Sequence, residues 1–196
     1  PAYSGRVTVP VLWDRKEQTI VSNESSEIIR MFNSAFDAWG DASLDLCPAR
    51  LRAEIDAVNE RVYPAINNGV YRAGFATTQI AYEEAFHQVF SMLDELEARL
   101  ADGRRFLFGD RLTEADVRLF VTLVRFDAAY HGLFKCNLRR LADYAALSAY
   151  TARIITLPGV RETVDIGHIK RGYYSIKALN PTGIVPLGPE LPAWLA

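Results

Sequence analysis

The sequence predicts an α+β protein, in which a short strand–turn–strand–helix segment precedes an all-helical region. Two short β-branched runs near the N-terminus, at residues 7–11 and 19–21, flank a charged turn, which is the pattern of a hairpin. From Ile28 onwards, apolar residues recur at helical spacing. Hydrophobic residues make up 49% of the chain and charged residues 23%. That composition predicts a sizeable folded core and excludes a disordered chain.

The charge balance and the cysteine content narrow the classes of function. The 196 residues include 22 Lys and Arg against 24 Asp and Glu, a net charge of −2, so we expect neither a nucleic-acid nor a membrane partner. No apolar run approaches the roughly 20 residues that span a bilayer. Cys47 and Cys136 suggest no disulfide framework, and the N-terminal residues have no signal-peptide pattern. We therefore expect a cytoplasmic protein.

Residues 1–36 are expected to form a hairpin and one helix. The turn occupies residues 14–18, and Ser22 and Asn23 are a capping signal for the helix. The apolar face of that helix consists of Ile28, Ile29, Phe32 and Phe36. A hairpin with one helix is marginal as a domain and leaves both sheet edges unpaired. We therefore expect this segment to be the end of a larger sheet. Either the other strands precede Pro1, or the missing part of the sheet is supplied otherwise.

Residues 37–47 are polar and contain glycine, which predicts a linker, and residues 48–196 are expected to form an all-helical domain. Helices are predicted over residues 50–62, 77–103, 113–126, 137–157 and 162–174. In the longest of them an apolar stripe begins at Ile80, and Gly103 supplies a left-handed end. The proline-rich tail from Lys177 is expected to lie extended over the helical domain.

Thr113 and Asp116 form a Thr-x-x-Asp pattern at the start of one predicted helix. The spacing is closely related to the capping box, in which the side chain at each end bonds the backbone at the other. We therefore assign Asp116 a structural role and expect its loss to cost about 1–2 kcal/mol.

Pro10 stands in the middle of the first predicted strand, where a proline cannot donate to a sheet ladder. One interpretation is an edge strand. The other is a cis Val9–Pro10 bond, which would turn the N–H and C=O of Val9 outward. Those groups could then pair with an extended peptide as an added strand.

Residues 23–27, with the sequence N-E-S-S-E, also have two interpretations. Their side chains can simply cap the following helix. Alternatively, the N–H groups at the helix start and the hydroxyl of Ser25 bind a carboxylate, while Glu24 binds an amine. A site for a carboxylate and an amine beside a peptide-pairing strand suits the γ-glutamyl end of glutathione.

Several long motifs, in order along the chain, resemble one family. V-P-V-L-W-D at 9–14 and T-I-V-S-N-E-S-S-E-I-I-R at 19–30 resemble the second half of a glutathione transferase thioredoxin-like domain. N-N-G-V-Y-R-A-G-F-A-T-T-Q at 67–79 and R-F-D-A-A-Y-H-G-L-F-K-C-N at 125–137 are similar to motifs of the Xi class, the glutathionyl-hydroquinone reductases. The likeness continues at residues 107–120, 168–174 and 180–189.

The resemblance implies a glutathione-transferase-like fold, glutathione as co-substrate, no metal, and a homodimer. It implies that Val9 pairs with the cysteinyl backbone of glutathione and that Pro10 is cis. It also implies that Glu24 and Ser25 bind the γ-glutamyl group.

Three tyrosines within the matched motifs, Tyr71, Tyr130 and Tyr173, are implied to line a hydroquinone pocket. Their phenols can bond to quinol oxygens and help to move protons at the ring. Residue type and spacing alone would instead make them amphipathic core residues. Gly172 stands where the family often has a bulky polar residue, which would loosen the pocket near Tyr173.

The family nucleophile is a cysteine in a Cys-Pro-Trp/Tyr motif, and this sequence has no such motif upstream of Val9. We therefore expect that cysteine to lie upstream of this chain, and we expect the chain alone to be inactive. Cys47 precedes Pro48 but follows a linker rather than a strand, which favours a simple helix start. Cys136 is expected to be a semi-buried thiol.

The sequence thus predicts glutathione-dependent reduction of glutathionyl-hydroquinones through a mixed disulfide. The alternative is a non-catalytic, transferase-like interaction module, although such a scaffold has no need for Glu24, Ser25 and the three tyrosines. A general conjugating transferase that uses Tyr3 or Ser4 ranks last, because both residues are poorly placed. The three histidines lack metal-ligand spacing.

Overall fold

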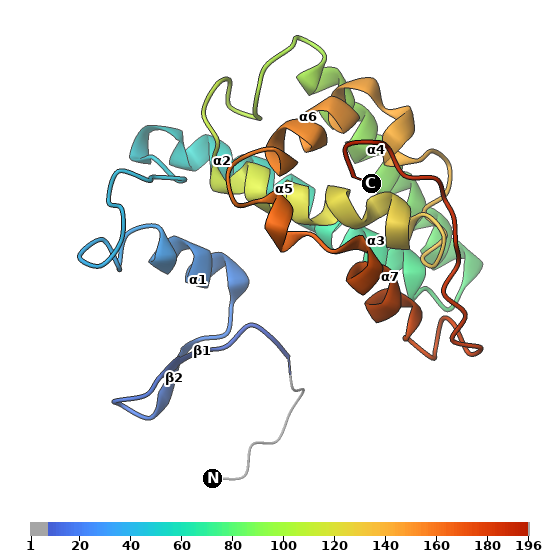
Figure 1. Ribbon diagram of the computed structural model, residues 1–196, viewed down its shortest axis with the longest axis horizontal. Helices are drawn as coiled ribbons and strands as arrows, with labels where there is room; N and C mark the ends of the chain where they lie inside the picture. Colours follow the sequence, from blue (N-terminus) through green and yellow to red (C-terminus); the bar gives the residue numbers. More distant parts are fainter. Residues whose placement is uncertain (1–7, 196) are drawn as a thin grey trace. The chain divides into compact units, whose positions relative to one another are not determined.

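The computed structural model describes residues 8–195, and the chain divides into two compact units, Pro1–Arg52 and Ala53–Ala196. Each unit is described on its own. The element order confirms the predicted α+β class, because a two-stranded hairpin and a helix come first and the remaining elements are helical (Figure 1). Among the described residues, no helix combines the length and the apolar character needed to cross a membrane.

The first unit contains an antiparallel hairpin of β1 (Leu12–Asp14) and β2 (Thr19–Ser22), followed by α1 (Ser25–Phe32). The register places Leu12 opposite Ser22. The residues just before β1 and just after β2 therefore leave the hairpin at the same end.

Two boundaries in this unit differ from the prediction. The first strand begins at Leu12 rather than within residues 8–11, and Pro10 in that stretch has no N–H to donate to a ladder. Helix α1 ends earlier than predicted, just before Asn33. The Asn33 side chain binds the N–H of Leu46, at 2.7 Å, and so ties the end of the helix to the following loop.

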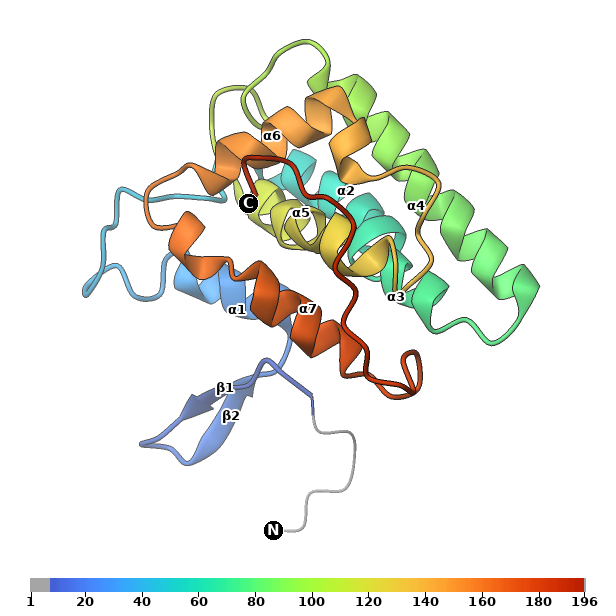
Figure 2. The same ribbon diagram turned by 45° about the vertical axis from the view of Figure 1, so that its right-hand side comes forward.

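The second unit is all-helical. Its α-helices are α2 (Arg52–Val62), α3 (Gly69–Gly74), α4 (Gln79–Leu100), α5 (Glu114–Arg125), α6 (Ala145–Ile155) and α7 (Ile166–Tyr174). Its shorter turns are the 3₁₀ segments Leu141–Asp143 and Arg161–Thr163 and the π-helical segments Tyr63–Asn67 and Phe126–Tyr130. The 3₁₀ segment Ala49–Leu51 lies at the end of the first unit and leads into α2. Helices α3 and α6 pack against α4, and Figure 2 shows α5 inside the unit, with α4 and α7 on different sides of it. Most of α5 is buried, so this helix forms the centre of the core.

The helix predicted over residues 137–157 begins later than expected, as α6. The Asp127 carboxylate accepts the N–H groups of Leu141 and Ala142, at 2.5 and 3.1 Å, and holds the preceding segment in a non-helical path. The Glu97 carboxylate on α4 accepts two N–H groups in the first turn of α6, at 2.8 and 2.7 Å. Carboxylates from other helices therefore decide where α6 begins.

Two smaller differences concern helix starts. Helix α7 begins after Asp165 rather than at residue 162, because the Asp165 carboxylate caps it by accepting the N–H of His168 at 2.8 Å. Ile80, in the first turn of α4, is 79% exposed. The apolar stripe of α4 therefore begins further along the helix than predicted.

The tail after α7 runs along the helices of its own unit without forming a further helix or strand among the described residues (Figure 1). The Trp194 indole N–H donates to the Ser148 hydroxyl on α6, at 3.2 Å. The Lys170 ammonium on α7 donates to the carbonyls of Leu187 and Gly188, at 2.9 and 3.1 Å. These contacts fasten the tail to α6 and α7.

Asp116 is completely buried and gathers four hydrogen-bond donors. Its carboxylate accepts the N–H and the hydroxyl of Thr113, both at 2.8 Å, the N–H of Leu107 at 2.8 Å, and the hydroxyl of Tyr150 at 2.9 Å. Thr113 and Asp116 form the predicted capping box. The same carboxylate also joins the start of α5 to the preceding loop and to α6.

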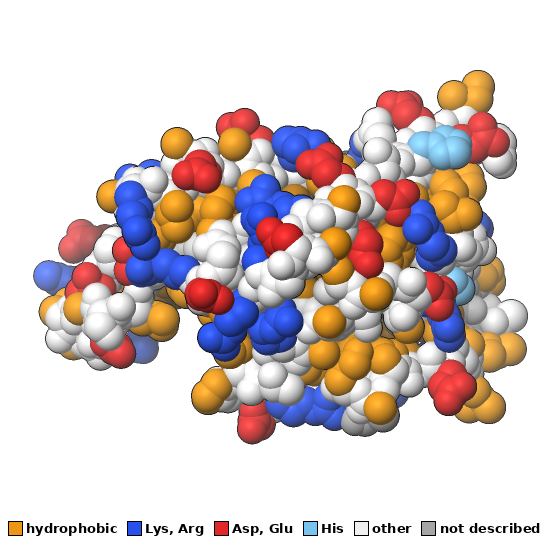
Figure 3. Space-filling view, turned by 90° about the horizontal axis from the view of Figure 1, so that it is seen from above, with side chains coloured by type: hydrophobic (Ala, Val, Ile, Leu, Met, Phe, Trp, Pro, Cys, Tyr) orange, Lys and Arg blue, Asp and Glu red, His pale blue; other side chains and the backbone are white. Residues whose placement is uncertain are grey.

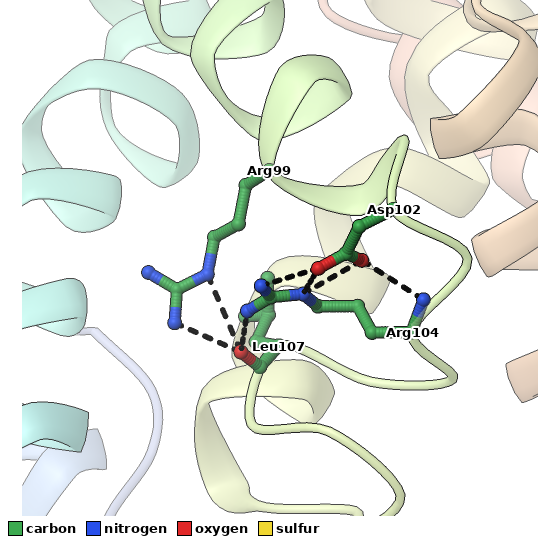
Figure 4. A network of polar contacts seen from close by, with 4 residues as sticks. All are labelled: Arg99, Asp102, Arg104 and Leu107. Atoms are coloured by element: carbon green, nitrogen blue, oxygen red, sulfur yellow. Dashed lines mark hydrogen bonds and ion pairs between the residues drawn. The ribbon is translucent and has the colours of Figure 1, made fainter.

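The backbone of Leu107 is held from both sides. Its N–H binds Asp116, and its carbonyl accepts from the Arg99 and Arg104 guanidinium groups, at 2.8 and 3.3 Å (Figure 4). Arg104 also binds Asp102 at 2.6 Å, and this hydrogen bonding lowers the pKa of Asp102 to about 2. Charged side chains thereby fix the loop between α4 and α5.

Side chains of both charges are mixed on the surface. Figure 3 shows Lys and Arg side chains interspersed with Asp and Glu across one face. Exposed ion pairs include Arg139–Asp94 at 2.6 Å and Arg140–Asp143 at 2.8 Å. Exposed pairs contribute little to stability, so the buried carboxylates matter more to this fold.

We expect Asp116→Ala to lower the free energy of unfolding by about 3–5 kcal/mol, because buried donors lose their acceptor. That exceeds the roughly 1–2 kcal/mol of a helix cap alone. Tyr150→Phe removes one donor of the four and is expected to cost about 1–2 kcal/mol. Urea unfolding followed by circular dichroism measures both values. An Asp116→Ala cost no larger than that of Tyr150→Phe would show that the carboxylate does not organise this region.

Candidate functional site

The three tyrosines predicted from the motifs meet in the second unit. Tyr71 lies on α3, Tyr130 ends the π-helical segment that follows α5, and Tyr173 lies on α7. The Tyr173 hydroxyl oxygen is 2.7 Å from that of Tyr71 and 2.7 Å from that of Tyr130. The fold therefore joins three separate elements through one chain of hydroxyl groups.

The ring of Phe134 packs against all three tyrosines. Its centroid lies 5.2 Å from those of Tyr71 and Tyr130 and 5.7 Å from that of Tyr173. Such contacts orient aromatic rings relative to one another, and Phe134 itself is fully buried. Sequence reasoning missed this residue. The signal available was its position in the 125–137 motif, four residues after Tyr130.

Gly74 ends α3 directly against Phe134. A Cβ at this glycine would lie 2.8 Å from the Phe134 Cβ and would overlap its ring. A glycine is needed where a backbone approaches a ring so closely. The position of α3, and with it that of Tyr71, therefore depends on Gly74.

Burial keeps the inner tyrosines neutral. Desolvation raises the pKa of Tyr173 to about 12. Tyr130 is only 2% exposed, and desolvation raises its pKa far above the ordinary value. Both phenols hold their protons at neutral pH and can donate hydrogen bonds.

The burial of Tyr130 places its hydroxyl at the inner end of the hydroxyl chain, 2% exposed. In the contacts of Tyr173 with Tyr130 and with Tyr71, either oxygen can be the donor. Tyr71, by contrast, is 38% exposed. Its hydroxyl is therefore the member of the chain most open to a ligand.

A cavity of about 360 Å³ adjoins this hydroxyl chain, and we call it the tyrosine cavity. Its lining consists of Tyr71, Arg125, His168, Ile169, Gly172, Tyr173 and Ile176. A Cβ built on Gly172 would meet nothing within 4 Å. The glycine thus leaves open space beside Tyr173.

The residues predicted to bind glutathione lie in the first unit. The Val9–Pro10 bond is cis, which is the second of the two interpretations above, and Val9 is 90% exposed. Glu24 and Ser25 are exposed at the start of α1, directly after β2. The hairpin register brings both groups to the same end of the hairpin.

Ser22 organises the first turn of α1. Its hydroxyl accepts the N–H of Glu24 at 3.1 Å and donates to the Glu27 carboxylate at 2.7 Å. Glu24 occupies the N-cap position without a side-chain capping bond. A capping role therefore does not account for the Glu24 carboxylate, and the N–H groups of a helix start suit an anion.

Neither cysteine of the sequence is an accessible thiol. Cys47 is 3% exposed and Cys136 is 0% exposed. Burial raises the pKa of Cys136 to about 12, which disfavours the reactive thiolate. Tyr3 and Ser4 lie outside the described residues. Within residues 8–195, no three His, Cys, Asp or Glu side chains are grouped so as to hold a metal ion.

Comparison with known proteins shows which family this architecture resembles. Residues 79–153 match the family model for the glutathione S-transferase C-terminal domain. A solved Xi-class glutathione transferase from Phanerochaete chrysosporium superposes with a TM-score of 0.91 and is 52% identical, over 95% of this chain and 64% of the other. The chain is a homologue of the Xi-class glutathione transferases. This homology confirms the predicted glutathione-transferase-like fold.

Two further proteins are similar to this Xi-class homologue over almost all of its length. Glutathionyl-hydroquinone reductase PcpF of Sphingobium chlorophenolicum is 59% identical over 193 residues, which are 98% of this chain and 61% of PcpF. The glutathione-bound structure of YqjG from Escherichia coli K-12 has a TM-score of 0.92 and 53% identity, over 97% of this chain and 62% of YqjG. The chain thus spans about three fifths of the length of the relatives it matches.

We expect Gly74→Ala to lower the free energy of unfolding by about 1–3 kcal/mol, because the added methyl group overlaps Phe134. Gly172→Ala, on α7, is the matched control. It has open space for the methyl group and is expected to raise stability by about 0.5–1 kcal/mol. Urea unfolding measures both values, and near-ultraviolet circular dichroism should change only in Gly74→Ala. Stabilisation by both substitutions would contradict the close contact of Gly74 with Phe134.

Proposed function

We propose that the protein to which this sequence belongs uses glutathione to reduce glutathionyl-hydroquinones to hydroquinones. The observation that supports this most is the chain of three tyrosine hydroxyls beside a cavity. PcpF and YqjG, both named glutathionyl-hydroquinone reductases, are 59% and 54% identical to the chain. The YqjG structure contains glutathione, and we propose the same co-substrate here.

In this proposal the first unit binds glutathione. The exposed backbone of Val9 beside the cis bond pairs with the cysteinyl group as an added strand. Glu24 binds the γ-glutamyl amine, and Ser25 with the helix-start N–H groups binds the adjoining carboxylate. Opposite charges on one small ligand are thereby matched by neighbouring residues.

The second unit binds the hydroquinone. The exposed Tyr71 hydroxyl bonds to a quinol oxygen, while Tyr173 and Tyr130 hold that hydroxyl in position from behind. Because the donors are fixed before the ligand arrives, little reorganisation is needed during the reaction. Tyr71 and Tyr173 line the cavity, whereas Tyr130 acts through Tyr173.

In the proposed reaction, a cysteine thiolate attacks the sulfur of the glutathionyl-hydroquinone. The bond from sulfur to the ring carbon breaks, its electron pair goes to that carbon, and a proton delivered there yields the hydroquinone. Cysteine and glutathione are left as a mixed disulfide. The thiolate of a second glutathione attacks it, which forms glutathione disulfide and frees the cysteine.

Cys47 and Cys136 are both buried, so our proposal takes the nucleophilic cysteine from outside this sequence. The 196-residue chain alone is then expected to bind hydroquinone without turning over the glutathionyl conjugate. Turnover by this chain that is lost in Cys47→Ser would contradict that placement. The homodimer and the cytoplasmic location stay predictions.

We expect Tyr71→Phe to weaken binding of methylhydroquinone to the chain about 5- to 10-fold, the effect of one lost hydrogen bond. Calorimetric titration under anaerobic conditions measures the dissociation constant. Tyr63→Phe is the control, since Tyr63 is 54% exposed and is not part of the cavity lining. Equal binding by both variants would remove the tyrosine cavity as the hydroquinone site.

A further inference from the structure

A second cavity of the same unit adjoins the tyrosine cavity. This side cavity, of about 330 Å³, lies between α5 and the residues that lead into α7. Arg125, His168 and Ile169 line both cavities. A substituent on a ring that lies at the tyrosine hydroxyls can therefore meet these shared residues, which line the same cavity as Tyr71 and Tyr173.

The side cavity has mostly apolar walls with a few polar groups. Phe120, Val121 and Val124 of α5 supply apolar surface, and Val121 is 43% exposed. Its one carboxylate, that of Asp165, is already bonded to the N–H of His168 as the cap of α7. The positive group shared with the tyrosine cavity is Arg125.

The Arg125 guanidinium is held at the shared wall. It donates to the carbonyl of Val121, one turn earlier on α5, and no described carboxylate forms an ion pair with it. Desolvation dominates the raised pKa of Tyr173, and the Arg125 charge acts in the opposite direction. Arg125 lines the same cavity as Tyr71 and Tyr173, so its charge can act on a ligand at the hydroxyl chain.

We propose that Arg125, with His168 beside it, makes the site selective for hydroquinones that carry a carboxylate on the ring. The inference rests on the proposed function, in which the tyrosine hydroxyls hold the quinol oxygens. A ring carboxylate would then reach the shared wall, where a guanidinium can bind it through two parallel hydrogen bonds. Neither the motifs nor the family resemblance pointed to this role.

The test compares two ligands of similar size with the full 196-residue chain, by anaerobic calorimetric titration. Gentisate is a hydroquinone with one carboxylate, and methylhydroquinone is its neutral counterpart. We expect gentisate to bind about tenfold more tightly, as for one charge-assisted hydrogen-bonded pair. Arg125→Gln should abolish that difference, because it removes the group that binds the gentisate carboxylate. Arg61→Gln, which removes an exposed charge paired with Glu95, is the control and should keep the preference.

Three other titration results would each contradict a different part of the account. Equal binding of the two ligands to the unaltered chain would overturn the anion selectivity and leave the proposed function standing. Failure of both ligands to bind would overturn the proposed function as well. Glutathione carries carboxylates too, so it is titrated separately. If Arg125→Gln weakens glutathione binding but not gentisate binding, Arg125 serves glutathione and our proposal is wrong.

Discussion

The buried Asp116 carboxylate is the contact on which the second unit depends. It fixes the start of α5 through Thr113 and ties that start to Leu107 and Tyr150. Helix α5 runs directly into the π-helical segment that ends at Tyr130. A hydrogen-bonded carboxylate at one end of a buried helix thus sets the position of a site residue beyond its other end. Burial of such a charge is tolerated because its oxygens are supplied with donors.

The candidate site combines an apolar aromatic base with a row of tyrosine hydroxyl groups at one edge. Phe134, seated against Gly74, supplies the base, and three rings from three elements pack on it. Their hydroxyls meet at Tyr173, and because Tyr130 is buried, the exposed hydroxyl of the chain is that of Tyr71. Such an arrangement recognises a flat ring by its faces and its oxygens by a donor that is already in place.

Local patterns predicted a large part of this architecture. The hairpin, the order of the helices and the Thr113–Asp116 cap follow from residue spacing, because they depend on neighbours along the chain. The start of α6 could not be predicted, because it is decided by carboxylates on other elements, Asp127 and Glu97. The resemblance of the motifs to the family predicted that the three tyrosines share one pocket, whereas their spacing alone would have assigned them to the core. Phe134 escaped notice because its role lies in a close tertiary contact.

The central claim is that a hydroquinone binds at the outward end of the tyrosine chain. Nuclear magnetic resonance of the chain with ring-labelled tyrosine, titrated with methylhydroquinone, tests it most directly. Signals would be assigned from single Tyr→Phe variants. Our account predicts large shifts for Tyr71 and Tyr173, a smaller one for buried Tyr130, and none for exposed Tyr63. Shifts confined to tyrosines outside this cluster would contradict it.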